Sequence, residues 1–304
     1  MNFYIHSGIF YLLMDQLPLD LLQYISSFIV NPSFIMLDWI QLEKLDWFIL
    51  SENPRAMDLL KQNPSQINWL SMCMNPCHEA ISLLEQNVIK INWRFLSKNE
   101  YAIPLIEKNF SRIKDRLDWY YLSQNPGAIF ILENNQDRIN WRGLCRNPNA
   151  ISLIKNNKNK ISWLDLCLNP NALELFEMNL NKVDWCLLSQ NPCAIPLLER
   201  FPEKIDWSYL SSNPSVHAIK ILEKNVDKTD WFFISQNPNA IQLLYENQEK
   251  INWHRLSINE NAMELLQSNP EKIFWSRLSL NPSIFKINQH KLKDEIFNTA
   301  QNLL

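Results

Sequence analysis

Glycine is nearly missing from this chain, with 3 in 304 residues, and several other common features are missing too. No apolar run reaches the eighteen or so residues of a membrane span, so we expect no transmembrane helix. The first residues lack a basic stretch and a small-residue cleavage site, so we expect no signal peptide. The six cysteines follow no disulfide or metal-ligand spacing, which favours an intracellular location.

The sequence also lacks a large excess of either charge and any catalytic motif. The formal net charge is -3, so the sequence predicts no general attraction to nucleic acid. It contains no nucleophile elbow, no phosphate-binding loop and no paired carboxylate motif. The five histidines are scattered, and none has enough neighbouring ligands for a zinc site. We therefore expect a protein that is not an enzyme and has no cofactor and no metal site.

Tryptophan, in contrast, recurs at a regular interval. The spacing is 22 residues at seven of ten steps and 24 or 26 at the others. A constant period of this length is typical of a repeat protein, in which each unit packs on its neighbours. The eleven repeats begin at these residues: Trp47, Trp69, Trp93, Trp119, Trp141, Trp163, Trp185, Trp207, Trp231, Trp253 and Trp275.

The residues around each tryptophan predict two short helices per repeat. Asp, Asn or Ser precedes the tryptophan in ten of eleven repeats, and these residues cap helix N-termini. Asn follows six residues after the tryptophan in all eleven repeats, and Pro follows that Asn in nine. Asn-Pro favours the end of one helix and the start of the next. A further Asn ends the second helix in most repeats, and we expect it to take the left-handed conformation there.

The predicted fold is an all-α solenoid of about eleven 22-residue helix–turn–helix repeats, with helical caps at both ends. We expect an N-terminal cap over 1–46, which includes a degenerate repeat over 25–46, then tandem repeats over 47–282 and a capping helix over 283–304. The tryptophans are expected to form a buried column that supplies the main contact between repeats. A leucine-rich repeat is the alternative, but it requires an apolar-x-apolar strand before the Asn.

Two positions after each tryptophan vary freely, and residues 142 and 143 in "INWRGLCRNPNAI" exemplify them. Variable residues on a fixed scaffold are where repeat proteins bind partners. Packing between neighbouring first helices is the alternative role for these side chains. The candidate partner-binding residues are the aromatic ones at these positions: Phe48, Phe95, Tyr120, Tyr121, Tyr209, Phe232 and Phe233.

A basic residue stands three residues before the tryptophan in ten of eleven repeats. Stacked repeats would align these cations in a basic column that could meet an anionic ligand or nucleic acid. The alternative is a structural role beside the end of the second helix, where the helix dipole favours cations. The candidate residues of the basic column are Lys90, Arg116, Arg138, Lys160, Lys182, Lys204, Lys228 and Lys250.

The segment 15–30, "DQLPLDLLQYISSFIV", resembles the opening of an F-box. That resemblance implies docking on a Skp-type adaptor of a cullin ubiquitin ligase, with substrate bound by the repeats. An amphipathic N-terminal cap that begins at Leu-Pro is the alternative. The residues that match the F-box pattern are Leu17, Pro18, Leu21, Leu22 and Ile25.

Over residues 25–282 the pattern "NPNAIxLLExNxxKIxW" resembles the repeat proteins of giant nucleocytoplasmic large DNA viruses. That resemblance implies an interaction role, in host cytoplasm, and no catalytic residues. We therefore expect a scaffold or adaptor that binds a protein partner through the variable face of the first helices. The alternatives are an F-box-like substrate receptor, a viral structural component, and a protein that binds nucleic acid along the basic column.

Overall fold

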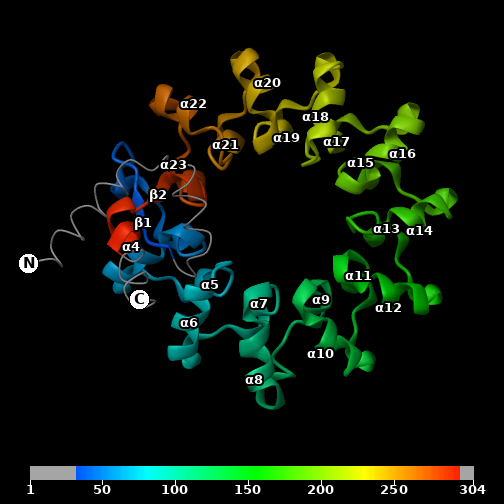
Figure 1. The fold of residues 1–304 in the computed structure, drawn as a ribbon, viewed down its shortest axis with the longest axis horizontal. Coiled ribbons are helices and arrows are strands. Elements are labelled where there is room, and N and C mark those ends of the chain that lie inside the picture. The colour runs from blue at the N-terminus through cyan, green and yellow to red at the C-terminus, as the bar shows by residue number, and fades with distance from the viewer. Residues whose placement is uncertain (1–31, 295–304) are drawn as a thin grey trace, which may run out of the picture.

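The computed structural model describes residues 32–294, in which two rows of short helices form a closed ring (Figure 1). The helices that begin at the tryptophans lie toward the centre, and the others lie outside them. We call them inner and outer helices. The inner helices are α3 (Trp47–Leu50), α5 (Trp69–Met72), α7 (Trp93–Leu96), α9 (Trp119–Gln124), α11 (Trp141–Arg146), α13 (Trp163–Leu166), α15 (Trp185–Ser189), α17 (Trp207–Ser211), α19 (Trp231–Ile234), α21 (Trp253–Leu256) and α23 (Trp275–Leu278).

The outer helices are α4 (Met57–Gln62), α6 (His78–Gln86), α8 (Ile103–Ile113), α10 (Ile129–Glu133), α12 (Ile151–Asn156), α14 (Leu173–Glu177), α16 (Ile195–Arg200), α18 (Val216–Glu223), α20 (Ile241–Glu246) and α22 (Met263–Ser268). In most repeats a 3₁₀ turn precedes the outer helix, as Pro148–Ala150 precedes α12. The all-α repeat fold predicted from the period is thus confirmed.

The inner helices begin where the capping residues predict. The side chain before the tryptophan accepts a hydrogen bond from a backbone N–H of the first turn in nine of the eleven inner helices. Asn140, for example, accepts from the amide of Gly143 at 3.1 Å. Ser162 and Phe274 are the two without such a bond. Caps matter here because helices of one turn leave most of their backbone N–H groups unpaired.

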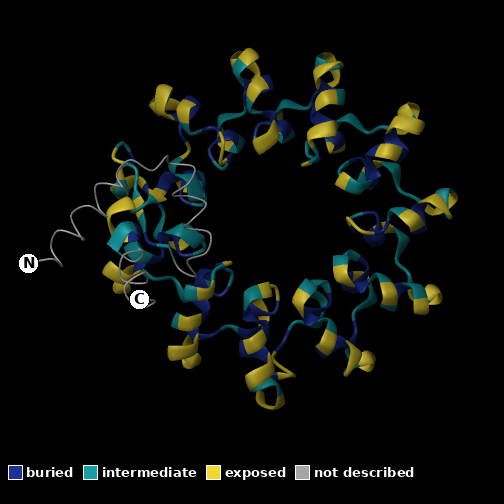
Figure 2. Cartoon of the chain, in the orientation of Figure 1, coloured by how far each residue is buried: buried dark blue, intermediate teal, exposed yellow. Residues whose placement is uncertain are grey.

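The core is built from leucine more than from tryptophan, which corrects the expected buried tryptophan column. Only Trp93 is buried, and the other ten repeat tryptophans are half-buried against the edge of the core. Figure 2 shows the buried residues as a band between the inner and outer helices. The third residue after each tryptophan is fully buried: Leu50, Met72, Leu96, Leu122, Leu144, Leu166, Leu188, Leu210, Ile234, Leu256 and Leu278.

A buried asparagine joins each repeat to the one before it. Asn147 Nδ2 donates to the carbonyl oxygens of Ser123 at 3.0 Å and Asn125 at 2.8 Å, both in the preceding repeat. Its Oδ1 accepts from the amide of Asn149 and so starts the next 3₁₀ turn. We call the equivalent residues the asparagine ladder: Asn53, Asn75, Asn99, Asn125, Asn147, Asn169, Asn191, Asn213, Asn237, Asn259 and Asn281.

The small residue four after each tryptophan forms a second link. Ser123 Oγ accepts from the amide of Asn140, the residue that caps the next inner helix, at 3.0 Å. Cys145 Sγ takes the same place and accepts from the amide of Ser162 at 3.4 Å. The position therefore requires a hydrogen-bond acceptor as well as a small side chain, which explains why every repeat has either Ser or Cys there.

The asparagine that ends most outer helices behaves differently from the prediction, and in α8 the helix continues past Asn109 to Ile113. No described residue has a positive φ, so the expected left-handed conformation is wrong. Asn157 has φ -128° and ψ 50°, and its Nδ2 donates to the carbonyl of Leu153 at 2.9 Å. The side chain thus satisfies a carbonyl that the end of the helix leaves free. This bond lets the chain turn without glycine.

The first repeat packs on the last one as though it followed it in sequence. Asn53 Nδ2 donates to the carbonyls of Ser279 and Asn281 at 3.0 and 3.1 Å, which are the bonds of the asparagine ladder. The amide of Asp46 donates to Ser279 Oγ at 2.8 Å, which is the bond of the small-residue position. Both sets of links therefore continue around the whole ring without a gap.

Two short strands lie across this junction, where the sequence predicted helical caps. Strand β1 (Phe34–Met36) pairs antiparallel with β2 (Phe285–Ile287), with Ile35 opposite Lys286. Helix resumes only at 289. The strands stand where helices of the degenerate repeat over 25–46 and of the C-terminal cap over 283–304 were expected. The ends of the array are thus paired with each other.

We expect Asn147→Leu to lower the free energy of unfolding by about 2–4 kcal/mol, because it leaves two buried carbonyls without donors. Asn53→Leu should cost about as much, because the closed ring gives it the same two acceptors. In an open array Asn53→Leu would lose only an N-cap, about 1 kcal/mol. Denaturant unfolding measures both, with exposed Asn156→Leu as a control expected within about 0.5 kcal/mol. A small effect at Asn53 alone would contradict ring closure.

Candidate binding surface on the inner helices

The two variable positions after each tryptophan, here +1 and +2, lie on the first turn of the inner helices. Four of the seven predicted aromatic residues are exposed: Phe48 by 48%, Phe95 by 36%, Tyr209 by 39% and Phe232 by 42%. The other three, Tyr120, Tyr121 and Phe233, are half-buried. Two pairs of adjacent rings make edge-to-face contacts, Tyr120 with Tyr121 and Phe232 with Phe233. Some of these aromatic side chains are therefore exposed, as partner binding requires, and others pack between side chains of the inner helices.

Side chains at +1 contact the start of the next inner helix. Arg94 Nε donates to Asp118, which caps α9, at 2.9 Å. Ser208 Oγ donates to Asp230, which caps α19, at 2.7 Å. His254 stacks edge to face on Phe274, the residue before α23, with ring centroids 5.1 Å apart. The +1 side chains thus bridge successive inner helices, so the surface continues from repeat to repeat.

Gly143 is not free to change, which corrects the interpretation of this position as variable. A Cβ on Gly143 would lie 2.4 Å from the carbonyl oxygen of Tyr120, which is closer than real Cβ atoms approach. Gly143 is buried on α11 where that helix packs against α9. The sequence alone does not show that this position must be glycine. The requirement comes from the spacing of these two helices.

A buried carboxylate, Asp165, stands at +2 of the next inner helix, α13, where nothing in the sequence predicted one. Asp165 is fully buried, and Arg142 and Arg146 of the preceding repeat donate to it from Nε at 3.0 and 2.8 Å. Ser162 Oγ also donates to it, at 2.7 Å. Burial alone would raise the pKa of Asp165, but these hydrogen bonds and the charge of Arg146 lower it below the ordinary aspartate value. Arg142 thus ties two repeats together.

The basic column lies over the tryptophans. Lys160 Nζ is 4.5 Å from the ring centroid of Trp141, which begins the same repeat, and the same contact closes the ring between Lys44 and Trp275 at 4.9 Å. Cations over indole faces are attracted by the ring quadrupole. Six of the eight predicted residues make this contact: Lys90, Arg138, Lys160, Lys182, Lys228 and Lys250.

The structure gives no such contact to the other two predicted residues, Arg116 and Lys204. Trp185, the ring that would lie under Lys204, packs edge to face on Phe201 instead, with ring centroids 5.4 Å apart. Phe201 stands where most repeats carry the terminal Asn. An aromatic neighbour has thus replaced the cation in this repeat.

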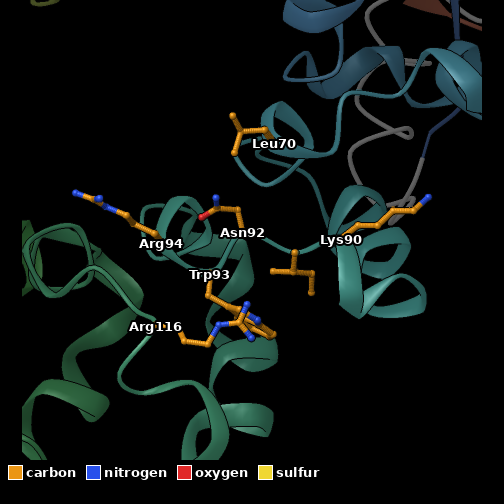
Figure 3. A pocket seen from close by; sticks show the side chains of 7 residues that line it. Leu70, Lys90, Asn92, Trp93, Arg94 and Arg116 are labelled. Atoms are coloured by element: carbon orange, nitrogen blue, oxygen red, sulfur yellow. The ribbon is translucent and has the colours of Figure 1, made fainter.

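A pocket of about 330 Å³ lies beside α7 and includes three cations (Figure 3). Lys90, Arg94 and Arg116 line it together with Trp93. The side chains of Lys90 and Arg94 extend in opposite directions, Lys90 over Trp69 and Arg94 to Asp118. The charges therefore do not converge on one point, as a site for a single anion requires.

Other features of the described residues 32–294 point to no second site. No three His, Cys, Asp or Glu side chains there gather closely enough to hold a metal ion. No helix in this part of the chain has the length and apolarity to cross a membrane. The F-box-like segment 15–30 and its docking residues lie outside the described residues. Comparison with protein-family models, curated proteins and solved structures finds no match to this chain.

We expect Gly143→Ala to destabilise the protein by about 1–3 kcal/mol, because the new methyl group overpacks the junction of α9 and α11. Helix propensity alone predicts the reverse, a gain of about 1 kcal/mol for Ala over Gly. Thermal or denaturant unfolding distinguishes the two by sign. A stabilised variant would show that α9 and α11 can separate without cost.

Asp165 should make stability depend on pH. Its pKa is lowered in the folded protein, so its contribution is present above the unfolded value of about 3.9 and is lost as pH falls through the folded value. We expect Asp165→Asn to cost about 1–3 kcal/mol at pH 7. The difference from wild type should shrink in acid, measured by urea unfolding from pH 7 to 3. A difference that stays constant with pH would contradict a charged Asp165.

Proposed function

We propose that the protein is a non-catalytic ring-shaped scaffold that binds a protein partner through its inner helices. The observation that carries the proposal is the set of exposed aromatic side chains on that surface. Phe48, Phe95, Tyr209 and Phe232 lie outside the fully buried leucine column, so burial in the core does not explain them. Large aromatic side chains on a fixed surface are the residues that contribute most to protein interfaces.

The framework under these residues supports a binding role. Each inner helix is tied to its neighbours through the asparagine ladder and through the Ser or Cys acceptor. A partner would therefore meet side chains whose backbone positions are already set. Preorganised surfaces lose less conformational entropy on binding than mobile ones do.

The basic column supports this choice over nucleic-acid binding, because six of its eight predicted cations already lie over indole rings. Phosphate contacts would have to compete with those interactions. The F-box-like receptor depends on residues 15–30, which lie outside the described residues. It is compatible with a ring that binds substrate on its inner helices.

The test compares inner and outer aromatic or apolar residues. In the inner variant Phe48, Phe95, Tyr209 and Phe232 are replaced by serine. In the outer control the exposed residues Phe130, Met178 and Val216 are replaced by serine. Both proteins and wild type are tagged, cross-linked in the cells that contain the protein and purified, and bound proteins are quantified by mass spectrometry. Circular dichroism confirms that each variant is folded.

We expect at least one protein to be retained by wild type and by the outer control but depleted about tenfold or more with the inner variant, as loss of interface anchors predicts. Equal retention by the inner variant would refute the proposal. Equal depletion with both variants would refute it too, because the inner surface would then have no special role.

A further inference from the structure

The inner helices α19, α21 and α23 carry a group of aromatic and cationic residues that we call the α19–α23 patch: Phe232, His254, Arg255, Phe274 and Arg277. The guanidinium of Arg255 lies over the Phe232 ring, 4.1 Å from its centroid. His254 packs edge to face on Phe274, which is 48% exposed. Arg255 and Arg277 both stand at +2, in successive repeats. The patch is therefore one continuous surface across three repeats.

The two arginines of this patch lack the carboxylate partners that other inner-helix arginines have. Arg94 pairs with Asp118, and Arg142 and Arg146 pair with Asp165. Within residues 32–294, Arg255 and Arg277 form no salt bridge. The positive charge of both is therefore not neutralised by a carboxylate of the described part of the chain.

Hydrogen bonding of these guanidinium groups is also incomplete. Arg255 donates from one terminal nitrogen to Gln236 Oε1 at 2.9 Å. The Nε atoms of Arg255 and Arg277 are buried and have no hydrogen-bond partner among residues 32–294. Buried donors without partners are unfavourable, and hydrogen bonds from arginine to carboxylates are among the strongest in proteins. A partner cannot reach the buried Nε atoms, so its carboxylates would pair with the terminal nitrogens of the two guanidinium groups.

We infer that the α19–α23 patch binds an acidic segment of a partner protein. Carboxylates of the segment pair with Arg255 and Arg277, and its apolar side chains pack on Phe232 and Phe274. This inference rests on the proposed function and names the chemistry of the partner. The complementarity is local, because the protein as a whole carries a net charge of -3.

The geometry favours a peptide over single-stranded nucleic acid. Sequence-tolerant binding of nucleic acid depends on bases that stack on free aromatic faces. One face of Phe232 is occupied by Arg255, and the edge-to-face contact with His254 restricts access to Phe274. Two arginines are also few compared with the extended basic groove that such proteins use.

The test measures fluorescence anisotropy of a short fluorescein-labelled peptide built from repeated Glu-Glu-Leu units, with the full-length protein. A Gln-Gln-Leu peptide of the same length and a labelled oligo-dT are the comparison ligands. The variant is Arg255→Gln with Arg277→Gln, and circular dichroism confirms that it is folded. The matched control is Arg94→Gln, an exposed arginine on α7 on the far side of the ring (Figure 1).

We expect the Glu-Glu-Leu peptide to bind wild type and Arg94→Gln equally, and to bind the double variant about tenfold or more weakly, as loss of charged hydrogen bonds predicts. The Gln-Gln-Leu peptide should bind wild type as weakly as the double variant binds the acidic one. No binding to wild type, equal binding of the two peptides, or an equal loss in Arg94→Gln would overturn the inference. Tighter binding of oligo-dT, lost in the double variant, would overturn it in favour of nucleic acid.

Failure here is distinguishable from failure of the proposed function. If cross-linked proteins still depend on Phe48, Phe95, Tyr209 and Phe232 while the acidic peptide does not bind, the scaffold proposal stands and the acidic chemistry is wrong. If no cross-linked protein depends on those residues, the scaffold proposal itself fails.

Discussion

The whole ring depends on one interaction, the hydrogen bonds of a buried asparagine amide with the repeat that precedes it. In Asn147 the amide nitrogen donates to two carbonyls of the preceding repeat, and the oxygen accepts from the backbone of its own. Every polar atom of the side chain is thereby used. The translation and rotation between adjacent repeats are therefore set at each junction by the same short bonds, and the same displacement is repeated around the array.

Closure changes what the terminal repeats need. An open solenoid leaves one face of its first and last repeats without a neighbour, and such arrays require capping units. Here Asn53 and Asp46 make at the last repeat the kinds of bond that Asn147 and Asn140 make at the repeat before theirs. Strand β1 and its partner β2 then cover the junction. The ring thus gains one more interface from the same length of chain, and fraying from free ends is removed.

The sequence predicts the structure within a single repeat. It does not predict features that depend on the rotation summed over many repeats or on contacts between neighbouring repeats. Caps such as Asn140 and the Asn-Pro corner are local, so the helices were predictable. Closure was not, because it depends on the small rotation per repeat, which the period does not contain. The sequence also did not reveal that Trp141 is half-buried. It did show the regular basic position to which Lys160 belongs, but not that Lys160 covers the face of this tryptophan. Gly143 and Asp165 acquire their constraints only from the repeats that lie against them.

At the +1 and +2 positions, side chains of the same type either bind another repeat or remain on the surface. Arg142 is an arginine on the inner surface, yet its guanidinium is bound to Asp165, so it ties two repeats together. Arg255 stands one residue later in its own repeat, and within the described range 32–294 its guanidinium has only Phe232 and Gln236 as partners. Where the ring supplies a carboxylate, the arginine serves the fold. Where residues 32–294 supply none, the charge is left for a molecule outside the ring, and the exposed aromatic rings beside it favour the protein partner that we propose over a simple ion.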